Sequence, residues 1–367
     1  MLAKLQVPAV HPAKFTLPGV TLESLPKWLI CIPLTLQWLW LGLRYRSLTL
    51  PTIANPAITA GGLVGEGKLE YFDGMGPIAL AATAVYCSIS THRPHSIADL
   101  RQLMRHSNLS FPVVAKPNVG LCGYGVRLLV NRRELQDYLA AFPINETVVL
   151  QQYLPQEGEA GIFYIRDPRA DAGRIIGLAL RYFPRVTGDG VRTIAELMAA
   201  EPRAQRLLKS SKHQPSHSAT LGANKVPALG EVVRLATIGS TRVGGLYRDG
   251  RVHITPELTR AIDAIAQDMP AFYFGRFDVR FDTLQDLSAG HGFSIMEING
   301  AGSEAIQAWD PGVGVLAGFR TIFKKQRILF AIADAMRCSG FKPVGVLKLA
   351  RLNRRQNKLI GHYPPSN

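Results

Sequence analysis

Cysteine and acidic residues are scarce in this chain, and each shortage bears on the classes of protein to which it can belong. The four cysteines, Cys31, Cys87, Cys122 and Cys338, lie far apart and form no CxxC pair. This spacing indicates neither a disulfide framework nor a zinc site, so we expect a reducing, cytoplasmic location. Asp and Glu number 27 against 42 Lys and Arg, which gives a net charge of +15. No nucleic-acid motif accompanies this excess, so nucleic acid is not an expected partner.

The chain also lacks a clear membrane-spanning run. Its Trp-rich stretch, residues 28–43, is uncharged, lies between Lys27 and the pair Arg44 and Arg46, and holds three of the four tryptophans. As a helix it would be about 24 Å long, short of the roughly 30 Å hydrocarbon core, and Pro33 interrupts it. No small-residue cleavage site follows, so a signal peptide is not indicated. A buried helix and an interfacial helix with basic flanks both stay open; the second would place the protein peripherally at the inner face of a membrane.

The chain is long and rich in hydrophobic residues, and its C-terminal part is basic. Its 367 residues are 47% hydrophobic, enough for two or three compact units. From Arg320 onward there are eleven Lys or Arg and one acid, Asp334. Residues 341–367 are therefore interpreted as a basic tail, which is either solvated or directed at an anionic surface.

Two predicted strands aim oxygen-bearing side chains at one point. In GRFDVRF, period-two alternation puts Arg276, Asp278 and Arg280 on one face and apolar residues on the other. In MEIN, the same rule puts Glu297 and Asn299 on a common face. Asp, Glu and Asn are hard oxygen ligands that suit Mg²⁺ or Mn²⁺. A solvated sheet face is the alternative for either strand alone, but the two strands together favour a metal site.

A lysine followed by a glycine-rich loop predicts a phosphate clamp. The segment FPVVAKP is a short predicted strand that carries Lys116, and Gly120, Gly123 and Gly125 follow it. Glycines let backbone amides curl around an anion without obstruction from Cβ atoms. A hairpin without a ligand is the alternative for this segment alone.

In this order, the pieces resemble the ATP-grasp superfamily, most closely the D-alanine:D-alanine ligase type of carboxylate-amine ligase, over about residues 68–340. In that family a first lysine matches Lys68 in GEGKLEYF, and a second matches Lys116. The strand VVLQQYLPQEGE resembles the one that receives adenine, with Glu159 or Glu157 on the ribose. The resemblance implies that ATP is bound by Lys68, Lys116, Gly120, Gly123, Gly125, Gln152, Tyr153, Leu154 and Glu159. It also implies that Mg²⁺ or Mn²⁺ is held by Asp278, Glu297 and Asn299, with Arg276 and Lys116 as catalytic residues.

Two further segments are similar to cyanophycin synthetase and to the ATP-grasp glutathione synthetases. They are RYFPRVTGDGVRTIAEL, which begins at Arg181, and GSTRVGGLYRDG, which contains Arg242. The similarity implies that these arginines bind an anionic substrate or the transferred phosphate; plain surface arginines are the alternative. The family's turn after the metal residues is replaced by GAGSEA, in which Glu304 favours a cationic amine as acceptor. The expected substrate contacts are Arg181, Arg242, Arg280, Ser303 and Glu304.

The predicted fold is α/β: an ATP-grasp fold of two α+β subdomains with a short atypical N-terminal region. The expected parts are residues 1–67, 68–150, 151–340 with the metal site, and the tail 341–367. The implied activity is ATP-dependent ligation of a carboxylate donor to an amine acceptor through an acylphosphate. An ATP-grasp kinase and a non-catalytic ATP-binding membrane protein stay open as alternatives, as does a homo-oligomer. His213 and His217 lie in a polar run that predicts a mobile loop rather than a metal-binding helix.

Overall fold

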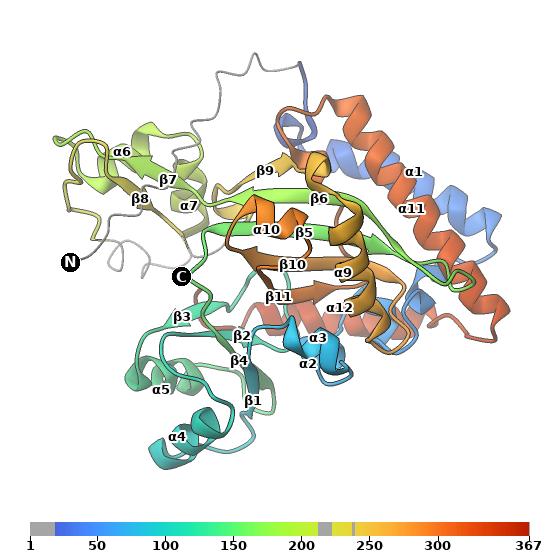
Figure 1. The fold of residues 1–367 in the computed structure, drawn as a ribbon, viewed down its shortest axis with the longest axis horizontal. Helices are drawn as coiled ribbons and strands as arrows, with labels where there is room; N and C mark the ends of the chain where they lie inside the picture. Colours follow the sequence, from blue (N-terminus) through green and yellow to red (C-terminus); the bar gives the residue numbers. More distant parts are fainter. Residues whose placement is uncertain (1–18, 212–221, 237–238, 367) are drawn as a thin grey trace.

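The structure is a computed structural model that describes residues 19–211, 222–236 and 239–366 and, for residues 208–211, the backbone alone. His213 and His217 lie outside the described residues. The named strands form three antiparallel sheets of four, five and two strands (Figure 1). The five-stranded sheet is central and its strands carry seven of the predicted site residues, among them the three predicted metal ligands.

The four-stranded sheet has the order β1-β4-β2-β3. Helices α4 and α5 contribute Leu100 and Leu135 to the core on one of its faces. Both helices begin at a capping side chain, Ser96 or Asn131, which accepts a backbone N–H three residues on. The elements are β1 (Tyr86–Ser90), α4 (Ile97–His106), β2 (Val113–Pro117), β3 (Arg127–Leu129), α5 (Arg132–Ala140) and β4 (Thr147–Gln152).

The central sheet has the order β11-β10-β5-β6-β9. Along β10 the phenylalanines and valine of FDVRF enter the core on one face, whereas Arg276, Asp278 and Arg280 lie on the other, as predicted. The strands are β5 (Gly158–Ile165), β6 (Arg174–Tyr182), β9 (Leu246–Asp249), β10 (Phe274–Phe281) and β11 (Phe293–Asn299). The apolar face is covered by α2 (Lys68–Phe72), α3 (Pro77–Ala81), α9 (Pro256–Gln267) and α10 (Leu284–Ser288).

Two long helices pack against the opposite face of the sheet, at the end that carries Phe163, Ile165 and Phe274. They are α1 (Lys27–Arg44) and α11 (Val315–Cys338). They run side by side in the same direction: the Gln37 side chain donates to the Phe323 carbonyl at 2.8 Å, and Arg337 donates to the Tyr45 carbonyl at 2.7 Å. Figure 1 shows the pair at the edge of the molecule, outside the central sheet. No helix among the described residues is long and apolar enough to cross a membrane.

A small third unit contains β7 (Arg185–Thr187), α6 (Ile194–Ala200), α7 (Ala204–Ser211) and β8 (Val232–Arg234). The Thr193 and Glu196 side chains form a capping box at the start of α6, as the spacing of these residues predicts. Short 3₁₀ helices connect the larger elements: η1 (Leu22–Ser24), η2 (Leu50–Ile53), η3 (Thr59–Gly62), η4 (Thr241–Val243), η5 (Arg251–His253) and η6 (Ile306–Trp309).

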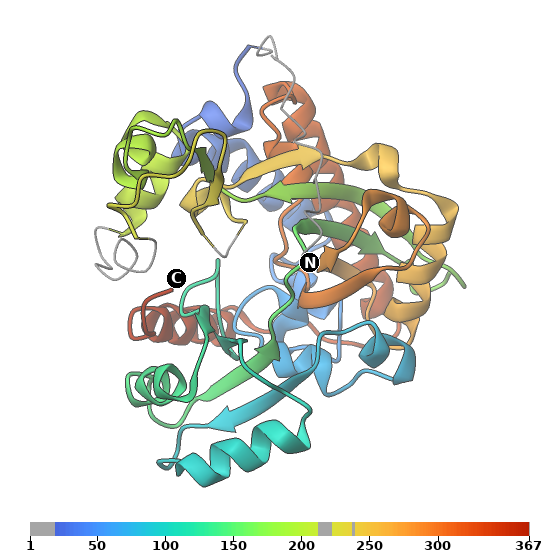
Figure 2. The same ribbon diagram turned by 60° about the vertical axis from the view of Figure 1, so that its left-hand side comes forward.

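The predicted basic tail is not simply solvated. It contains α12 (Val346–Ile360), which lies beside the four-stranded sheet (Figure 2). Arg355 of α12 pairs with Glu146 at 2.9 Å, and the buried Gln356 reaches the glycine-rich loop. The basic residues lie on the outer face, because a 3.6-residue period lets one side of the helix pack while the other stays in water.

Candidate active site

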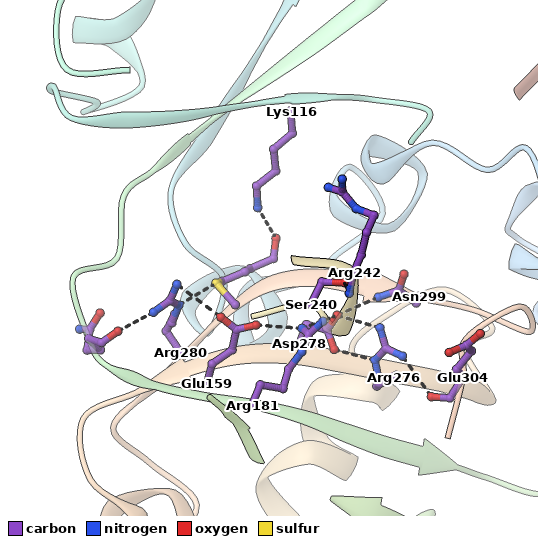
Figure 3. Close-up of polar contacts among 12 residues, drawn as sticks. Lys116, Glu159, Arg181, Ser240, Arg242, Arg276, Asp278, Arg280, Asn299 and Glu304 are labelled. Atoms are coloured by element: carbon purple, nitrogen blue, oxygen red, sulfur yellow. Dashed lines mark hydrogen bonds and ion pairs between the residues drawn. The ribbon is translucent and has the colours of Figure 1, made fainter. Parts of the chain in front are cut away.

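A row of buried ion pairs crosses three strands of the central sheet (Figure 3). Arg276 makes two contacts with Asp278, from Nε to Oδ1 at 2.6 Å and from Nη2 to Oδ2 at 2.9 Å. Arg181 bridges Asp278 at 3.3 Å and Glu159 at 2.9 Å, and Arg280 reaches the second oxygen of Glu159 at 3.3 Å. Burial opposes ionisation of Asp278, yet the two arginines hold its pKa below the ordinary value. The row is therefore charged and rigid.

The three predicted metal ligands lie together. Asp278 stands opposite Glu297 in the β10–β11 register, and the Asn299 amide donates to Asp278 Oδ2 at 3.3 Å. No group of three His, Cys, Asp or Glu that could hold a metal ion occurs in the described part of the chain. The third predicted ligand at this site, Asn299, is an amide and so falls outside such a group. Two carboxylates and an amide oxygen nevertheless fit Mg²⁺ or Mn²⁺, which are commonly held by one or two carboxylates together with phosphates of the substrate.

Two lysines lie close to the opposed carboxylates Asp278 and Glu297. Lys68, at the start of α2, lies 3.2 Å from Glu297. Lys116, on β2 of the smaller sheet, donates to Gln151 Oε1 at 2.6 Å and to the Met296 carbonyl of the central sheet at 3.2 Å. Burial lowers the pKa of Lys116 to about 8, with Lys68 contributing and Glu297 opposing. Lys116 therefore links the two sheets across the space where the sequence predicts the nucleotide phosphates.

The glycine-rich loop after β2 lies over Lys68. A Cβ atom at Gly120 would lie 3.1 Å from Lys68 Nζ, so glycine leaves room for the ammonium. Gly123 and Gly125 have φ values of 75° and 72°, which favour glycine. At Gly125 a Cβ would also lie 2.7 Å from Pro117.

The C-terminal segment holds this loop in place, a role that the sequence does not predict. Three of its side chains donate hydrogen bonds to loop carbonyls, and each contact joins residues more than two hundred positions apart. The pairs are Gln356 with Gly120 (3.0 Å), Tyr363 with Val119 (2.5 Å) and Ser366 with Gly123 (2.8 Å). These bonds fix the position of three carbonyls of the loop.

The predicted adenine and ribose residues lie where the chain passes from the smaller sheet to the central one. Gln152 ends β4 and is exposed, whereas Leu154 is buried and Tyr153 is half-buried. Glu159 belongs to the ion-pair row, and Glu157 is an exposed partner of two arginines. Both ribose alternatives therefore stay open.

Two of the predicted substrate arginines, Arg181 and Arg242, are not plain surface residues. The Arg181 side chain is only 12% exposed. Arg242, on η4, stacks over the Tyr124 ring of the glycine-rich loop at 4.6 Å. Its Nε and Nη2 atoms are buried and have no hydrogen-bond partner among the described residues. Arg242 thus spans from the central part of the molecule to the loop with two unused donors.

The end of the site near Glu304 contains a lysine that sequence reasoning missed. Ser303 is buried, and its hydroxyl donates to the Gly300 carbonyl at 2.7 Å. Glu304 is exposed, and its backbone carbonyl accepts a hydrogen bond from Arg276 at 3.0 Å. Burial lowers the pKa of Lys325, on α11, to about 8, and Glu304 opposes that shift. A signal was present, because Lys325 lies three residues after the buried Ile322 and four before the buried Leu329 and so shares the apolar face of α11.

Part of this chain is similar in sequence to a known protein family, and the chain is similar to several solved structures. Residues 82–166 match the family model of the RimK-like ATP-grasp domain, less than a quarter of the chain. This match confirms the predicted resemblance to the ATP-grasp superfamily and the α/β ATP-grasp fold. No curated protein matches the sequence.

Three solved structures are similar at low identity. A bifunctional glutathione synthetase from Pasteurella multocida is 19% identical, with 68% of this chain and 35% of that one covered and a TM-score of 0.34. A D-alanine–D-alanine ligase from Bacillus anthracis is 14% identical, with coverages of 76% and 69% and a TM-score of 0.41. The VanG D-Ala:D-Ser ligase from Enterococcus faecalis is 13% identical, with coverages of 69% and 59% and a TM-score of 0.37. The chain thus spans about a third of the glutathione synthetase.

Proposed function

We propose that the protein is an ATP-dependent carboxylate-amine ligase that forms an amide through an acylphosphate. The observation that carries the proposal is the meeting of two lysines from different elements at the opposed pair Asp278 and Glu297. Five cations and three carboxylates form this cluster, a surplus of two positive charges that suits a polyphosphate. They are Lys68, Lys116, Arg181, Arg276 and Arg280 with Glu159, Asp278 and Glu297.

In the proposed reaction, a donor carboxylate oxygen attacks the γ-phosphorus of ATP, the bond to the bridging oxygen breaks, and ADP leaves. Lys116 and Lys68 neutralise phosphate oxygens during this transfer, because Lys116 precedes the glycine-rich loop and the Lys68 ammonium lies beside Gly120 of that loop. Mg²⁺ or Mn²⁺ held by Asp278, Glu297 and Asn299 would supply further neutralisation of the phosphates.

In the second half-reaction the acceptor amine, in its neutral form, attacks the acyl carbon; phosphate leaves, and the proton lost from the amine passes to phosphate or water. Negative charge develops on the acyl oxygen, and Arg276 is the buried donor suited to stabilise it. Arg242 supports the binding of an anionic group by its two buried unpaired donors. Glu304, exposed at the other end, attracts the ammonium form of the acceptor.

The test is a screen of carboxylate and amine pools for ADP release, repeated with hydroxylamine as the trap for an acylphosphate. We expect a hydroxamate that needs ATP and a carboxylate, and no hydroxamate from Glu297→Gln. A matched control is Glu257→Gln, an exposed glutamate on α9. ADP release with a phosphorylated hydroxyl compound and no hydroxamate would replace the ligase with a kinase; no ADP release from any pool would remove both.

A further inference from the structure

Helix α1 has two apolar faces, and only one of them is used by the fold. The inner face packs on α11: Ile30 and Leu41 are buried, and the Trp38 ring meets Phe330 edge-on at 5.0 Å. This contact explains why the helix is apolar on that side. It leaves the composition of the other side unexplained.

The outer face of α1 is a continuous apolar stripe in contact with water. Positions three and four apart along the helix share this face, and no charge interrupts it between Lys27 and Arg44. Trp28, Leu36 and Leu43 are 67%, 62% and 78% exposed. The stripe comprises Trp28, Ile32, Leu36, Leu39, Trp40 and Leu43. A soluble surface rarely keeps such a patch without a partner.

Cations predominate around the stripe, and the acids beside α1, Glu23 and Asp334, are paired with arginines. Residues 24–65 contain no Asp or Glu. At the end of α1 the Arg44 guanidinium lies over the Trp40 ring at 5.4 Å, so the charge adjoins the apolar surface directly. The neighbouring helix α11 adds exposed basic residues on its own outer face. The exposed cations are Lys27, Arg44, Arg46, Arg320, Lys324 and Arg327.

This charge pattern decides between two occupants of the stripe. In a two-fold contact between copies, an antiparallel pairing of the stripes would bring Lys27 of one copy to Arg44 of the other, and a parallel pairing would bring like residues together. Both arrangements repel. A surface of anionic phospholipid instead satisfies the cations and the apolar face together.

We propose that the outer face of α1 lies in the headgroup region of a membrane that contains anionic phospholipids. The helix is about 27 Å long, lies in the plane of the interface and buries its leucines to a depth of about 5–10 Å. Trp28 and Trp40, near its two ends, suit this position because their rings combine an apolar body with a polar N–H.

The experiment is flotation of the full chain with vesicles of phosphatidylcholine alone and of phosphatidylcholine mixed with phosphatidylglycerol. We expect binding to the mixed vesicles that weakens at high salt. The double variant Leu36→Glu, Leu43→Glu should lose at least about tenfold in vesicle affinity. The matched control is Leu229→Glu, Val252→Glu, which adds the same charge at positions elsewhere that are at least as exposed. Circular dichroism melting curves of both variants check that the fold is kept.

Three outcomes overturn the proposal. One is failure of the parent chain to bind either vesicle. Another is equal loss of affinity in both double variants, which would make the binding a matter of net charge alone. The last is a parent dimer in light scattering that Leu36→Glu, Leu43→Glu converts to a monomer, which would assign the stripe to a second copy. Quenching of Trp28 and Trp40 fluorescence by brominated lipid would instead place the stripe in the bilayer.

Discussion

Replacement of Lys116 by methionine should stabilise the ligand-free protein while removing its use of ATP. Burial lowers the pKa of this lysine from 10.5 to about 8. At about 1.4 kcal/mol per pKa unit, the charged form is about 3 kcal/mol less favourable in the folded than in the unfolded protein. Methionine keeps much of the volume and carries no charge. Its cost is the loss of the donor to Gln151 Oε1, about 1–3 kcal/mol, which leaves a net gain of about 1 kcal/mol near neutral pH.

The pH dependence of this effect gives a sharper test than its size. Because the folded pKa of Lys116 lies below the unfolded one, the unfolded state binds more protons between about pH 8 and 10.5, and the stability of the parent rises with pH across that window. At about pH 9.5 the penalty has fallen to about 1 kcal/mol. The advantage of Lys116→Met should therefore shrink by about 2 kcal/mol from about pH 7 to pH 9.5 and change sign.

The assay is urea unfolding of parent and variant, followed by circular dichroism at both pH values, with Lys348→Met as the control at an exposed lysine. ATP binding is measured alongside, and the Lys116 variant should lose at least about tenfold in affinity, since a phosphate contact of a charged side chain is removed. A variant that is less stable than the parent by the same amount at both pH values would refute the reasoning, because Lys116 would then be an ordinary packed residue.

Four further changes test other parts of the site. Glu297→Gln should abolish ATP turnover at a nearly parental melting temperature, whereas Asp278→Asn should also lower that temperature, since two buried arginines lose their counter-charge; equal melting temperatures would mean that the arginines find other partners. Glu304→Gln should reduce amide product roughly ten- to a hundredfold with little change in hydroxamate; a parallel loss of both products would move Glu304 to the donor side. Tyr363→Phe, which removes the contact with Val119, should raise the KM for ATP about two- to tenfold at a similar kcat; a lower melting temperature with an unchanged KM would make the contact structural only.

The sequence predicts the charged face of β10 because alternation along one strand is a local property. Each of Arg276, Asp278 and Arg280 follows from its position in GRFDVRF, and the structure keeps that pattern. The Arg181 bridge between Glu159 and Asp278 is different, because these residues lie on three strands. Their neighbourhood depends on the order of β6, β5 and β10 in the sheet, which no single strand specifies.

For helix α1 and for the C-terminal segment, too, the sequence alone does not specify what the side chains pack against. The composition of α1 leaves a buried and an interfacial helix open, since a continuous apolar run has no face that periodicity can assign. The structure gives it one buried and one exposed face. The segment after Gly361, HYPPSN, has a tail-like sequence, yet Tyr363 packs on Phe142 with ring centroids 5.1 Å apart. That contact depends on where α12 delivers the chain, which only the folded molecule defines.

The proposed acceptor end of the site lies where two distant turns meet. Ala301 and Gly302 donate their N–H groups to the carbonyls of Gly61 and Gly62, at 3.0 and 2.7 Å. Gly62 has a φ of 76°, and a Cβ there would lie 2.6 Å from the Gly300 Cα, so glycine is required for the two backbones to approach.

This junction joins the segment that leads into Lys68 to the turn that carries Glu304. A shift of either turn would therefore move Lys68, the proposed phosphate-binding lysine, and Glu304, the proposed acceptor-side carboxylate, together, since the backbone bonds couple them. By contrast, Lys116 and the glycine-rich loop belong to the smaller sheet and to its C-terminal brace, so ATP can be held on that side without the junction. We therefore expect acceptor choice to depend on residues 60–66 and 300–304, and ATP affinity to depend chiefly on the loop and the segment that holds it.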